Sequence, residues 1–391
     1  MSARSRRIIV VGASLAGAHA VHTLRREGFD GEILLIGAEV HAPYDRPPLS
    51  KGSLTESRAF DGLGLRFLRN CEFDPRFGVQ VRSLDATART IELAGGERLA
   101  FDGLVIATGS SPVRLDPERF PAVTYLRTVE DAAALAGWLR AATGPLVILG
   151  AGLIGCEVAA TARGLGVEVV LVDPLLPCER AIGPRAGEVL RQMHAEQGVA
   201  MCLAETAVCA EPDGRLISVR TSGGRELEAG AVLAAIGARP ETRWLEGSGL
   251  TLDDGVVCDG ECLAAPGIVA AGDVARWRHP RGLARLEHWN NAVEQGRHAA
   301  RSLLAELDGR PAEPYLPVPW FWSDQYGHKI QVAGWVTPDC ELEIVEGDPA
   351  ELRFFAEYRS GDGVVAAIGV DAAKSFNAWL AEPGRATAGM R

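Results

Sequence analysis

Two glycine-rich segments have the spacing that suits a dinucleotide phosphate. Residues 150–155 read G-A-G-L-I-G, a complete G-x-G-x-x-G, whereas residues 12–17 read G-A-S-L-A-G, with Ser14 in place of the second glycine. In such a turn the first glycine permits a tight bend, the second lets the backbone approach phosphate, and the third packs helix against strand. Because serine is small and can donate a hydrogen bond, we expect the first turn to keep its ligand with altered geometry.

An acidic residue follows each turn at a distance that fits recognition of a ribose. Asp173 lies 23 residues after Gly150 (173 − 150), and Glu39 lies 27 residues after Gly12 (39 − 12). A carboxylate there accepts hydrogen bonds from a free 2′-hydroxyl and repels a 2′-phosphate, so the second site should prefer NADH to NADPH. Arg180, close by in the sequence, could accommodate a phosphate and tempers that preference.

Each turn lies between a buried strand and a helix, as a phosphate-binding turn requires. Continuous apolar runs predict buried parallel strands, and helices that end near residues 27 and 164 should follow the two turns. The predicted strands are 7–11, 32–36, 146–149 and 167–172. Two further segments, 101–109 and 267–273, read as strands that end in a glycine turn and an exposed acid, and they favour a flavin at the first site. A nicotinamide site and a flavin site on one chain imply hydride transfer between the two cofactors.

Composition narrows the class of protein. The 391 residues are 47% hydrophobic and 23% charged, which suits a globular protein of two or three domains. The net charge of −11 argues against a nucleic acid or an anionic membrane as partner, and no apolar run is long enough to span a bilayer. Arg4, Arg6 and Arg7 precede an apolar stretch that imitates a signal peptide, but the glycine spacing favours a first strand, so we expect a cytoplasmic protein.

The cysteines do not suggest a disulfide framework or a metal site. Eight are scattered along the chain and none forms a Cys-x-x-Cys pair. Cys258 and Cys262 lie four residues apart without two further ligands nearby, so we expect ordinary thiols and no bound metal.

The chain resembles the FAD-dependent ferredoxin reductases that serve Rieske oxygenases and haem-thiolate monooxygenases, a branch of the pyridine nucleotide-disulfide oxidoreductases. The resemblance covers essentially the whole chain. It rests on PYDRPPLSK at 43–51, ATG at 107–109, LRT at 126–128, GARP at 237–240, AGD at 271–273, EHWNNA at 287–292 and VPWFWSDQ at 318–325.

The resemblance implies an α/β fold with two Rossmann-like domains, of the glutathione-reductase type, and a C-terminal α+β domain. The FAD domain should be split into 1–112 and 242–315, with the NAD domain at 113–241 inserted between the pieces. Residues 316–391 should form the C-terminal domain, with strands at 329–333, 341–345, 352–358 and 364–370.

The same resemblance implies roles for single residues. Lys51 would lie beside the isoalloxazine, paired with Glu157, and these two are the candidate catalytic residues. Ala16 and Glu39 would contact the FAD pyrophosphate and the adenosine ribose, Val81 and Arg127 the adenine and pyrophosphate, Asp273 the ribitol, and Trp289 the flavin ring. The full candidate set for FAD is Gly12, Ser14, Ala16, Gly17, Glu39, Arg46, Lys51, Val81, Thr108, Gly109, Arg127, Gly272, Asp273, Trp289 and Trp320. The candidates for NADH are Gly150, Gly152, Ile154, Gly155, Glu157, Asp173, Arg180 and Gly237.

Trp320 and Trp322 are separated by one residue in an expected strand. We expect them to point to opposite faces, so that one belongs to the core and the other, taken as Trp320, covers the flavin.

The destination of the electrons follows from a missing residue. Disulfide reductases of this wider fold carry a cysteine pair in the helix after the ribose-binding acid, and this chain has no cysteine before Cys71. Electrons should therefore pass to an external acceptor, and a [2Fe–2S] ferredoxin fits best. Two alternatives stay open: an NADH oxidase or peroxidase, and a redox signalling flavoprotein like the apoptosis-inducing factors.

One basic stretch could receive an acidic ferredoxin. Arg276, Arg278, Arg281 and Arg285 lie between Asp273 and Trp289 in an otherwise acidic protein. Such a patch would steer docking beside the flavin, and a solvated loop is the equally weighted alternative. The sequence leaves the oligomeric state open between monomer and homodimer.

Overall fold

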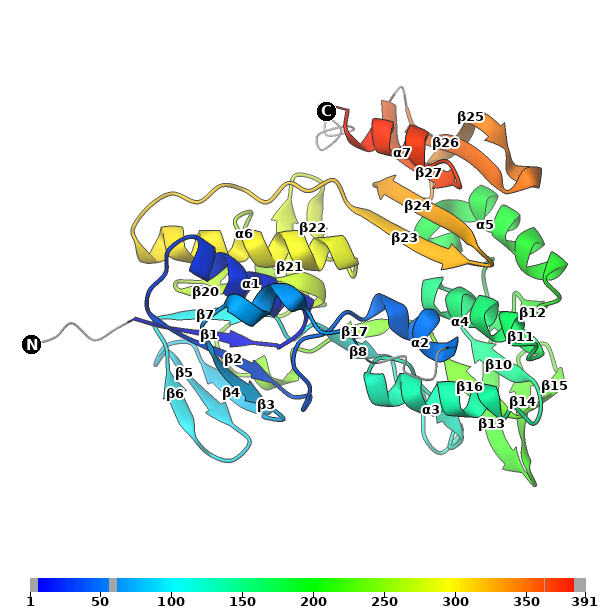
Figure 1. Ribbon diagram of the computed structural model, residues 1–391, viewed down its shortest axis with the longest axis horizontal. Coiled ribbons are helices and arrows are strands. Elements are labelled where there is room, and N and C mark those ends of the chain that lie inside the picture. The colour runs from blue at the N-terminus through cyan, green and yellow to red at the C-terminus, as the bar shows by residue number, and fades with distance from the viewer. Residues whose placement is uncertain (1–5, 56–61, 362, 383–391) are drawn as a thin grey trace, which may run out of the picture.

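The computed structural model describes residues 6–55, 62–361 and 363–382, which form three units: two built around parallel sheets and one around an antiparallel sheet (Figure 1). We call them the first nucleotide unit, the second nucleotide unit and the C-terminal unit. The last nine residues of the predicted C-terminal domain, 383–391, lie outside the described residues.

The first nucleotide unit is a six-stranded sheet with β1 near its centre. The strand order is β19-β20-β7-β1-β2-β3, and β1 pairs in parallel with both β2 and β7. The strands are β1 Arg7–Val11, β2 Glu32–Gly37, β3 Asp74–Phe77, β7 Gly103–Ile106, β19 Leu263–Ala265 and β20 Ile268–Ala270. Strands from both predicted pieces of the chain thus share one sheet, and we keep 1–112 and 242–315 as the proposed domain limits.

Helices α1 (Leu15–Arg26) and α6 (Trp289–Leu307) lie side by side against this sheet (Figure 1). They can approach closely because residue 296 is glycine and has no side chain. A Cβ at Gly296 would lie 2.4 Å from the carbonyl oxygen of Ala16. Smaller sheets complete the unit: β4 Val81–Asp85, β5 Thr90–Leu93 and β6 Arg98–Ala100; and β18 Val256–Cys258, β21 Ala275–His279 and β22 Gly282–Ala284.

The second nucleotide unit repeats the plan of the first. Its strand order is β12-β11-β10-β16-β9, with β10 in the place of β1 and β11 in the place of β2. The elements are β9 Val123–Thr124, α3 Val129–Arg140, β10 Leu146–Leu149, α4 Leu153–Gly164, β11 Val169–Asp173, α5 Glu179–Glu196, β12 Ala200–Leu203 and β16 Ala231–Ala234. A three-stranded sheet of β13 Ala207–Asp213, β14 Leu216–Thr221 and β15 Glu226–Ala229 is attached. The antiparallel pair β8 (Ser110–Pro112) and β17 (Ala238–Pro240) links the two units at both crossings of the chain.

The C-terminal unit is an antiparallel sheet covered on both faces. Its order is β23-β24-β27-β26-β25, with bounds β23 Trp320–Gln325, β24 His328–Gly334, β25 Glu341–Asp348, β26 Arg353–Ser360 and β27 Gly363–Val370. Helix α7 (Ala373–Leu380) packs on one face through Phe376 and Trp379. The other face joins the core of the second nucleotide unit, where Tyr358 donates a hydrogen bond to the carbonyl of Ile182, 2.6 Å away. The sequence predicted the four later strands but not the full extent of β23, nor α7.

A short segment of the first unit reaches across to the second. It comprises residues 44–55 and contains η1 (Pro47–Ser50) and α2 (Gly52–Thr55), and its residues Tyr44, Leu49 and Leu54 are buried in the core of the second unit. This crossing segment carries Lys51 toward α4. The remaining 3₁₀ helices are η2 Arg66–Asn70, η3 Arg243–Leu245, η4 Gly272–Val274 and η5 Pro349–Glu351. Within the described residues, no helix is long and apolar enough to cross a bilayer.

Candidate functional site

A cavity of about 1000 Å³ opens at the carboxyl ends of the central strands of the first nucleotide unit. Residues from all three units line it, and its volume is at the upper end of that of ligand pockets. In open α/β sheets ligands bind at this edge, where the strand order reverses. The fold thus provides a site of ligand size beside the first glycine turn.

The first glycine turn is packed too tightly for any side chain at its two ends. Gly12 has φ +116°, and a Cβ there would lie 2.0 Å from the carbonyl oxygen of Ala107. A Cβ at Gly17 would lie 2.0 Å from the carbonyl oxygen of Gly12. The turn therefore brings the N-terminus of α1, with its unpaired backbone N–H groups, to the wall of the cavity, where an anion is favoured.

The second turn has the same construction. A Cβ at Gly150, with φ +104°, would lie 2.3 Å from the carbonyl oxygen of Ala235, and one at Gly155 would lie 2.0 Å from that of Gly150. A Cβ at Gly152, in contrast, would meet nothing within 4 Å. The middle glycine is thus free of protein contacts, and its equivalent Ser14 is accommodated in an extended conformation at φ −123°. Backbone geometry does not require glycine at this position in either turn.

The acid of the first site is held by side chains. Glu39 accepts hydrogen bonds from Arg46 Nη2 and from the Tyr44 hydroxyl, each at 2.5 Å. Burial is the largest cause that raises the pKa of Tyr44 above its usual range, so the phenol stays protonated and donates. Arg46 also lies 3.2 Å from Ser14 Oγ and therefore ties the acid to the glycine turn.

The acid of the second site is held by backbone. Asp173 accepts from the N–H of Ala151 at 2.7 Å and from the N–H of Leu175 at 2.8 Å. These bonds fix the carboxylate against the turn, at the end of β11. The nearby Arg180 lies exposed on α5.

Asp273 and Arg127 face each other across the cavity wall. Asp273 Oδ2 accepts from Ser110 Oγ at 2.8 Å and from Arg127 Nη2 at 3.2 Å. We expect Arg127 to lie at the adenine and pyrophosphate. In the structure its guanidinium contacts Asp273, the acid that we assign to the ribitol.

The expected ion pair between Lys51 and Glu157 is present. Lys51 Nζ lies 2.8 Å from Glu157 Oε2, and Glu157 is only 5% exposed. Two hydroxyls complete its surroundings: Ser50 Oγ donates to Oε2 at 2.5 Å and Ser323 Oγ donates to Oε1 at 2.7 Å. A buried carboxylate needs such partners to remain ionised. Lys51 comes from the crossing segment, Glu157 from α4 and Ser323 from β23, so the three units meet at this carboxylate.

Our prediction for the two tryptophans is wrong. Residues two apart along a strand point to the same face, and the rings of Trp320 and Trp322 accordingly lie 5.7 Å apart. Trp322 lines the cavity and meets Trp289 edge to face at 5.7 Å, whereas Trp320 packs toward α7. The residue that belongs to the site is therefore Trp322 and not Trp320. Trp289 lines the cavity as expected and donates to Asp45 Oδ1 at 2.6 Å.

Buried polar atoms without a protein partner provide a test of whether FAD fits. His288 Nδ1 and Trp244 Nε1 both belong to residues of the cavity wall and have no hydrogen-bond partner among the described residues. Burial lowers the pKa of His288 to about 4, so its imidazole is neutral at physiological pH. Together with the helix N-terminus and the two acids, these donors and acceptors fit a ligand with phosphates, hydroxyls and a polar ring system.

The cavity brings most of the predicted FAD residues together. Those that line it are Gly12, Ser14, Ala16, Glu39, Arg46, Lys51, Val81, Thr108, Gly109, Arg127, Gly272, Asp273 and Trp289. Gly17 lies behind them at the contact between turn and helix. Of the residues assigned to NADH, Ile154 and Glu157 on α4 also line the cavity, while the rest of that set surrounds the second turn outside it: Gly150, Gly152, Gly155, Asp173, Arg180 and Gly237.

Sequence reasoning missed several residues of the site. Ser50, Ser323 and His288 were not singled out, although each neighbours a residue that was. The two-residue period of β23 could have found one of them, because Ser323 and Gln325 are polar on the face where the neighbouring Phe321 is apolar.

The predicted basic patch is largely neutralised. Arg276 pairs with Asp253 at 2.6 Å, and Arg285 pairs with Asp254 at 3.1 Å and with Glu287 at 2.6 Å. Arg278 is exposed on β21, and the guanidinium of Arg281 lies 5.9 Å from the ring centre of Trp335. The patch is therefore less positive than its sequence indicates.

The described residues contain no group of three or more His, Cys, Asp or Glu that could hold a metal ion, and their cysteines are all free thiols.

Known proteins resemble the chain along most of its length. Residues 6–296 match the model of the pyridine nucleotide-disulphide oxidoreductase family, and residues 320–380 match a reductase C-terminal domain. The chain is 38% identical to rhodocoxin reductase of Rhodococcus erythropolis, over 87% of this chain and 80% of that protein. It is 37% identical to the ferredoxin reductase component of chlorobenzene dioxygenase from a Cupriavidus strain, over 94% and 90%.

Solved structures show the same architecture along nearly the whole chain. The ferredoxin reductase for the CYP199A2 system from Rhodopseudomonas palustris superposes with a TM-score of 0.89 at 30% identity, over 95% of this chain and 92% of that one. The reductase in the covalent putidaredoxin reductase–putidaredoxin complex superposes with a TM-score of 0.88 at 31% identity, over 96% and 92%. The chain therefore belongs to the pyridine nucleotide-disulphide oxidoreductase family, and it ends in the reductase C-terminal domain.

Proposed function

We propose that this protein is an NADH-dependent ferredoxin reductase, which holds FAD at the first glycine turn and NADH at the second, and which passes single electrons to a [2Fe–2S] ferredoxin that serves an oxygenase. One observation carries the proposal. Helix α4 begins at the second turn and places Ile154 and Glu157 in the wall of the cavity behind the first turn. The helix that starts at the second turn therefore reaches the cavity beside the first turn, which would bring the two cofactors to one reaction space.

The proposed contacts of FAD follow the length of the cavity. The α1 N-terminus with Ser14 and Ala16 would hold the pyrophosphate, Glu39 the adenosine ribose and Asp273 the ribitol. Arg46, Val81 and Arg127 would line the adenine and pyrophosphate part. Trp289 and Trp322 would cover the ring system.

The second turn and Asp173 would hold NADH by the same chemistry, with Gly237 and Arg180 near the ligand. When bound, FAD accepts a hydride from NADH and returns electrons one at a time. The protein supplies position and charge. Lys51 would present a cation to the ring, and Glu157 would fix the direction of that cation.

The relatives and the cysteines support an external acceptor. Two similar proteins are the ferredoxin–NAD(+) reductase components of the p-cumate and benzene dioxygenase systems, with which the chain shares 39% and 36% identity. Within the described residues, no cysteine lines the cavity, so no internal dithiol lies beside the proposed flavin site. Electrons would then have to leave the chain.

Reconstitution tests this function. The FAD-loaded protein, NADH and candidate [2Fe–2S] ferredoxins would be mixed, and reduction of cytochrome c followed. We expect ferredoxin-dependent reduction with NADH, and a much lower rate with NADPH. Oxygen consumption that accounts for the electrons of all the NADH consumed, as peroxide or as water, with no effect of any ferredoxin, would instead identify an oxidase. Slow turnover with every acceptor would point to a signalling role.

We further propose that Arg278 and Arg281 on the β21–β22 hairpin contribute to ferredoxin docking. The hairpin is connected to the cavity through Arg285, whose Nη1 donates to the carbonyl of Asp273 at 3.2 Å. Exposed arginines attract acidic partners and give a salt-dependent association rate.

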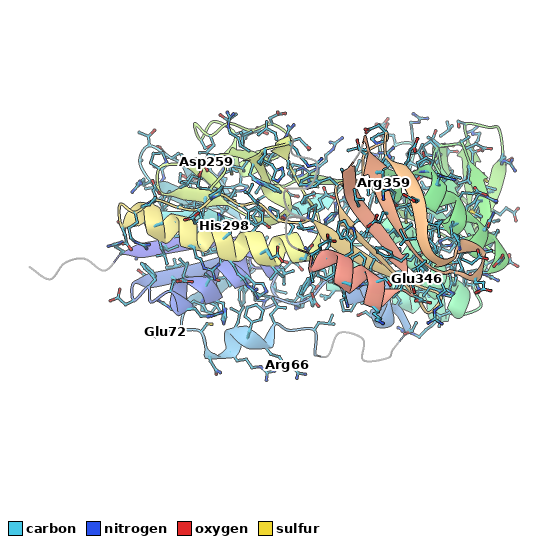
Figure 2. All side chains as sticks on the ribbon, turned by 90° about the horizontal axis from the view of Figure 1, so that it is seen from above. Arg66, Glu72, Asp259, His298, Glu346 and Arg359 are labelled. Atoms are coloured by element: carbon cyan, nitrogen blue, oxygen red, sulfur yellow. The ribbon has the colours of Figure 1, made fainter. Side chains whose placement is uncertain are left out.

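Charge reversal tests this surface against a matched control. Arg278→Glu with Arg281→Glu should raise the KM for ferredoxin about tenfold or more and flatten its salt dependence, with NADH-to-dye activity unchanged. Arg66 lies on the opposite side of the first unit from Asp259, which follows the strand β18 that pairs with β21 (Figure 2). Arg66→Glu with Arg69→Glu therefore serves as the control pair. An effect of the control pair alone would contradict docking at the hairpin and assign it to the opposite surface.

A further inference from the structure

A continuous line of hydrogen bonds runs from the C-terminal unit to Glu157. Ser323 Oγ contacts Glu157 Oε1 at 2.7 Å, and Gln325 Nε2 contacts Ser323 Oγ at 3.0 Å. Gln325 Oε1 lies 3.0 Å from His194 Nε2, and His194 Nδ1 lies 2.8 Å from the Tyr326 hydroxyl. The line crosses from β23 to α4 in one direction and to α5 in the other.

The chemistry of each group gives the line a single direction near Glu157. Lys51 can only donate, so Glu157 accepts as a carboxylate. The single hydroxyl proton of Ser323 is then used for Glu157 Oε1, and Ser323 must accept from its other neighbour. The amide nitrogen of Gln325 is a donor and meets this requirement, which also fixes the orientation of the amide.

The hydrogen bonds between Gln325, His194 and Tyr326 have a single direction as well. The remaining atom of the amide, Gln325 Oε1, can only accept, so His194 Nε2 carries a proton. Burial lowers the pKa of His194 to about 4, so the ring is neutral and its Nδ1 is an acceptor. The Tyr326 hydroxyl then donates to Nδ1. Four successive donors, from Tyr326 to Ser323, all point toward one carboxylate.

The three inner members of this line have no alternative partner in water. Ser323 and His194 are 0% exposed and Gln325 is 1% exposed, so a broken link would leave a polar group unpaired inside the protein. A merely apolar contact between β23 and the second unit would not need three polar side chains in sequence. The hydrogen bonds that these side chains donate end at Glu157, the carboxylate that pairs with Lys51.

We propose that Ser323 and Gln325 are positioning residues for the Glu157–Lys51 pair, and that the C-terminal unit thereby completes the site where NADH and flavin react. The proposal rests on the proposed function for its consequence, but not for its geometry. Glu157 shares Oε2 with Lys51 and Ser50, so the donor on Oε1 decides how the carboxylate is turned. Without it the carboxylate is free to rotate, and Lys51 loses a fixed partner.

The direction of the line can be read without any turnover. The ¹⁵N spectrum of the histidine side chains, recorded on the wild-type protein with and without FAD, should show His194 neutral with the proton on Nε2. His194→Gln identifies the signal by its loss. A protonated His194 at neutral pH, or a proton on Nδ1, would overturn the proposed direction.

Two variants and a control test the consequence. Ser323→Ala removes the donor, while Gln325→Glu keeps the shape but replaces the donating amide by an acceptor that competes for the Ser323 hydroxyl. In anaerobic stopped-flow mixing with NADH, Ser323→Ala should lower the limiting rate of flavin reduction about ten- to hundredfold, the effect of one hydrogen bond to a charged group. Gln325→Glu should lower it by less, and both should leave the Kd for NADH unchanged. The control is Asp324→Asn. Asp324 lies on the opposite face of β23, where it pairs with Lys329, so this variant should retain the wild-type rate.

The outcomes separate the two proposals. Wild-type rates in both variants, or rates reduced equally in Asp324→Asn, would overturn positioning by β23. If NADH fails to reduce the flavin of the wild-type protein, the proposed function is wrong, and the ¹⁵N spectrum still decides the geometry.

Discussion

The two glycine turns follow corresponding central strands of their sheets, β1 and β10, yet they differ at the middle residue. Both ends of each turn are closed by backbone: a Cβ would lie 2.0 Å from a carbonyl oxygen at Gly12 and 2.3 Å at Gly150. At the middle, Gly152 is open to its surroundings while Ser14 is held by Arg46. The comparison separates glycines that the fold itself requires from a glycine that only a ligand would require.

The acids of the two sites differ in the same way. Glu39 is held by side chains from the crossing segment, Tyr44 and Arg46, whereas Asp173 is held by backbone N–H groups of its own turn and strand end. The first site therefore uses residues that pack against the second unit, whereas the second site is local. The hydrogen bonds that hold Glu39 come from Tyr44 and Arg46 and not from the second turn, so we expect damage confined to that turn to leave the first acid in place.

The largest effect should come from closing a turn at its first glycine. Gly150→Ala forces a Cβ against the Ala235 carbonyl in a backbone conformation that costs several kcal/mol, so affinity for NADH should fall by at least about 100-fold. The FAD content should be unchanged. Gly12→Ala should instead lose FAD and lower the stability of the first unit. Calorimetric NADH binding and flavin content measure both. Loss of FAD in Gly150→Ala would show that the sites are not separable.

A second effect concerns discrimination between the nicotinamide cofactors. Asp173→Asn removes the charge but keeps an oxygen for the backbone N–H groups. The ratio of kcat/KM for NADH over NADPH should fall about ten- to hundredfold, because repulsion of a 2′-phosphate is lost. Glu39→Gln is the matched change at the first site and should leave this ratio unaltered. An unchanged ratio in Asp173→Asn would contradict the assignment of the second turn to NADH.

Exchange of the middle residues should have smaller and unequal effects. Gly152→Ser should weaken NADH binding about tenfold if backbone and phosphate approach closely there, with stability altered by less than about 1 kcal/mol. Ser14→Gly should change FAD affinity less, because Ser14 needs no special backbone conformation. Melting temperatures and the two affinities would be compared. A loss of stability in Gly152→Ser that exceeds the loss of NADH affinity would refute the ligand-only role of this glycine.

The smallest effect should be that of mild acid on the first site. Burial holds the pKa of His288 near 4, so affinity for FAD should stay constant from about pH 8 to pH 5. Stability behaves differently. The unfolded chain takes up a proton on this histidine below about pH 6.5 and the folded chain does so only near pH 4, so this contribution is lost as pH falls through that window. A drop in FAD affinity near pH 6.5 would mean that His288 titrates in the site.

The parts of the molecule that local pattern determines were predictable from sequence. The bounds of β1 and β10 agree with the structure at both ends, because apolar runs bounded by glycine leave little freedom. The family resemblance anticipated the Lys51–Glu157 pair. The architecture of two Rossmann-like units and a C-terminal α+β unit is confirmed.

What sequence could not give depends on contacts between distant residues. Ser323 and Glu157 are 166 positions apart and meet only because β23 packs on α4. The ion pairs that neutralise Arg276 and Arg285 could not be predicted for the same reason. Their partners, Asp253 and Asp254, precede them by more than twenty residues. The tryptophan assignment failed on a local rule, the two-residue period of a strand, and was therefore avoidable.

The central claim is that two separate nucleotide sites converge on one cavity. An anaerobic titration of the FAD-loaded protein with NADH, followed by flavin absorbance, tests it most directly. We predict that one NADH per chain bleaches the flavin completely, and that Gly150→Ala, with the same FAD content, needs a large excess. Bleaching of Gly150→Ala at the wild-type NADH concentration, or no bleaching of the wild-type protein, would contradict it.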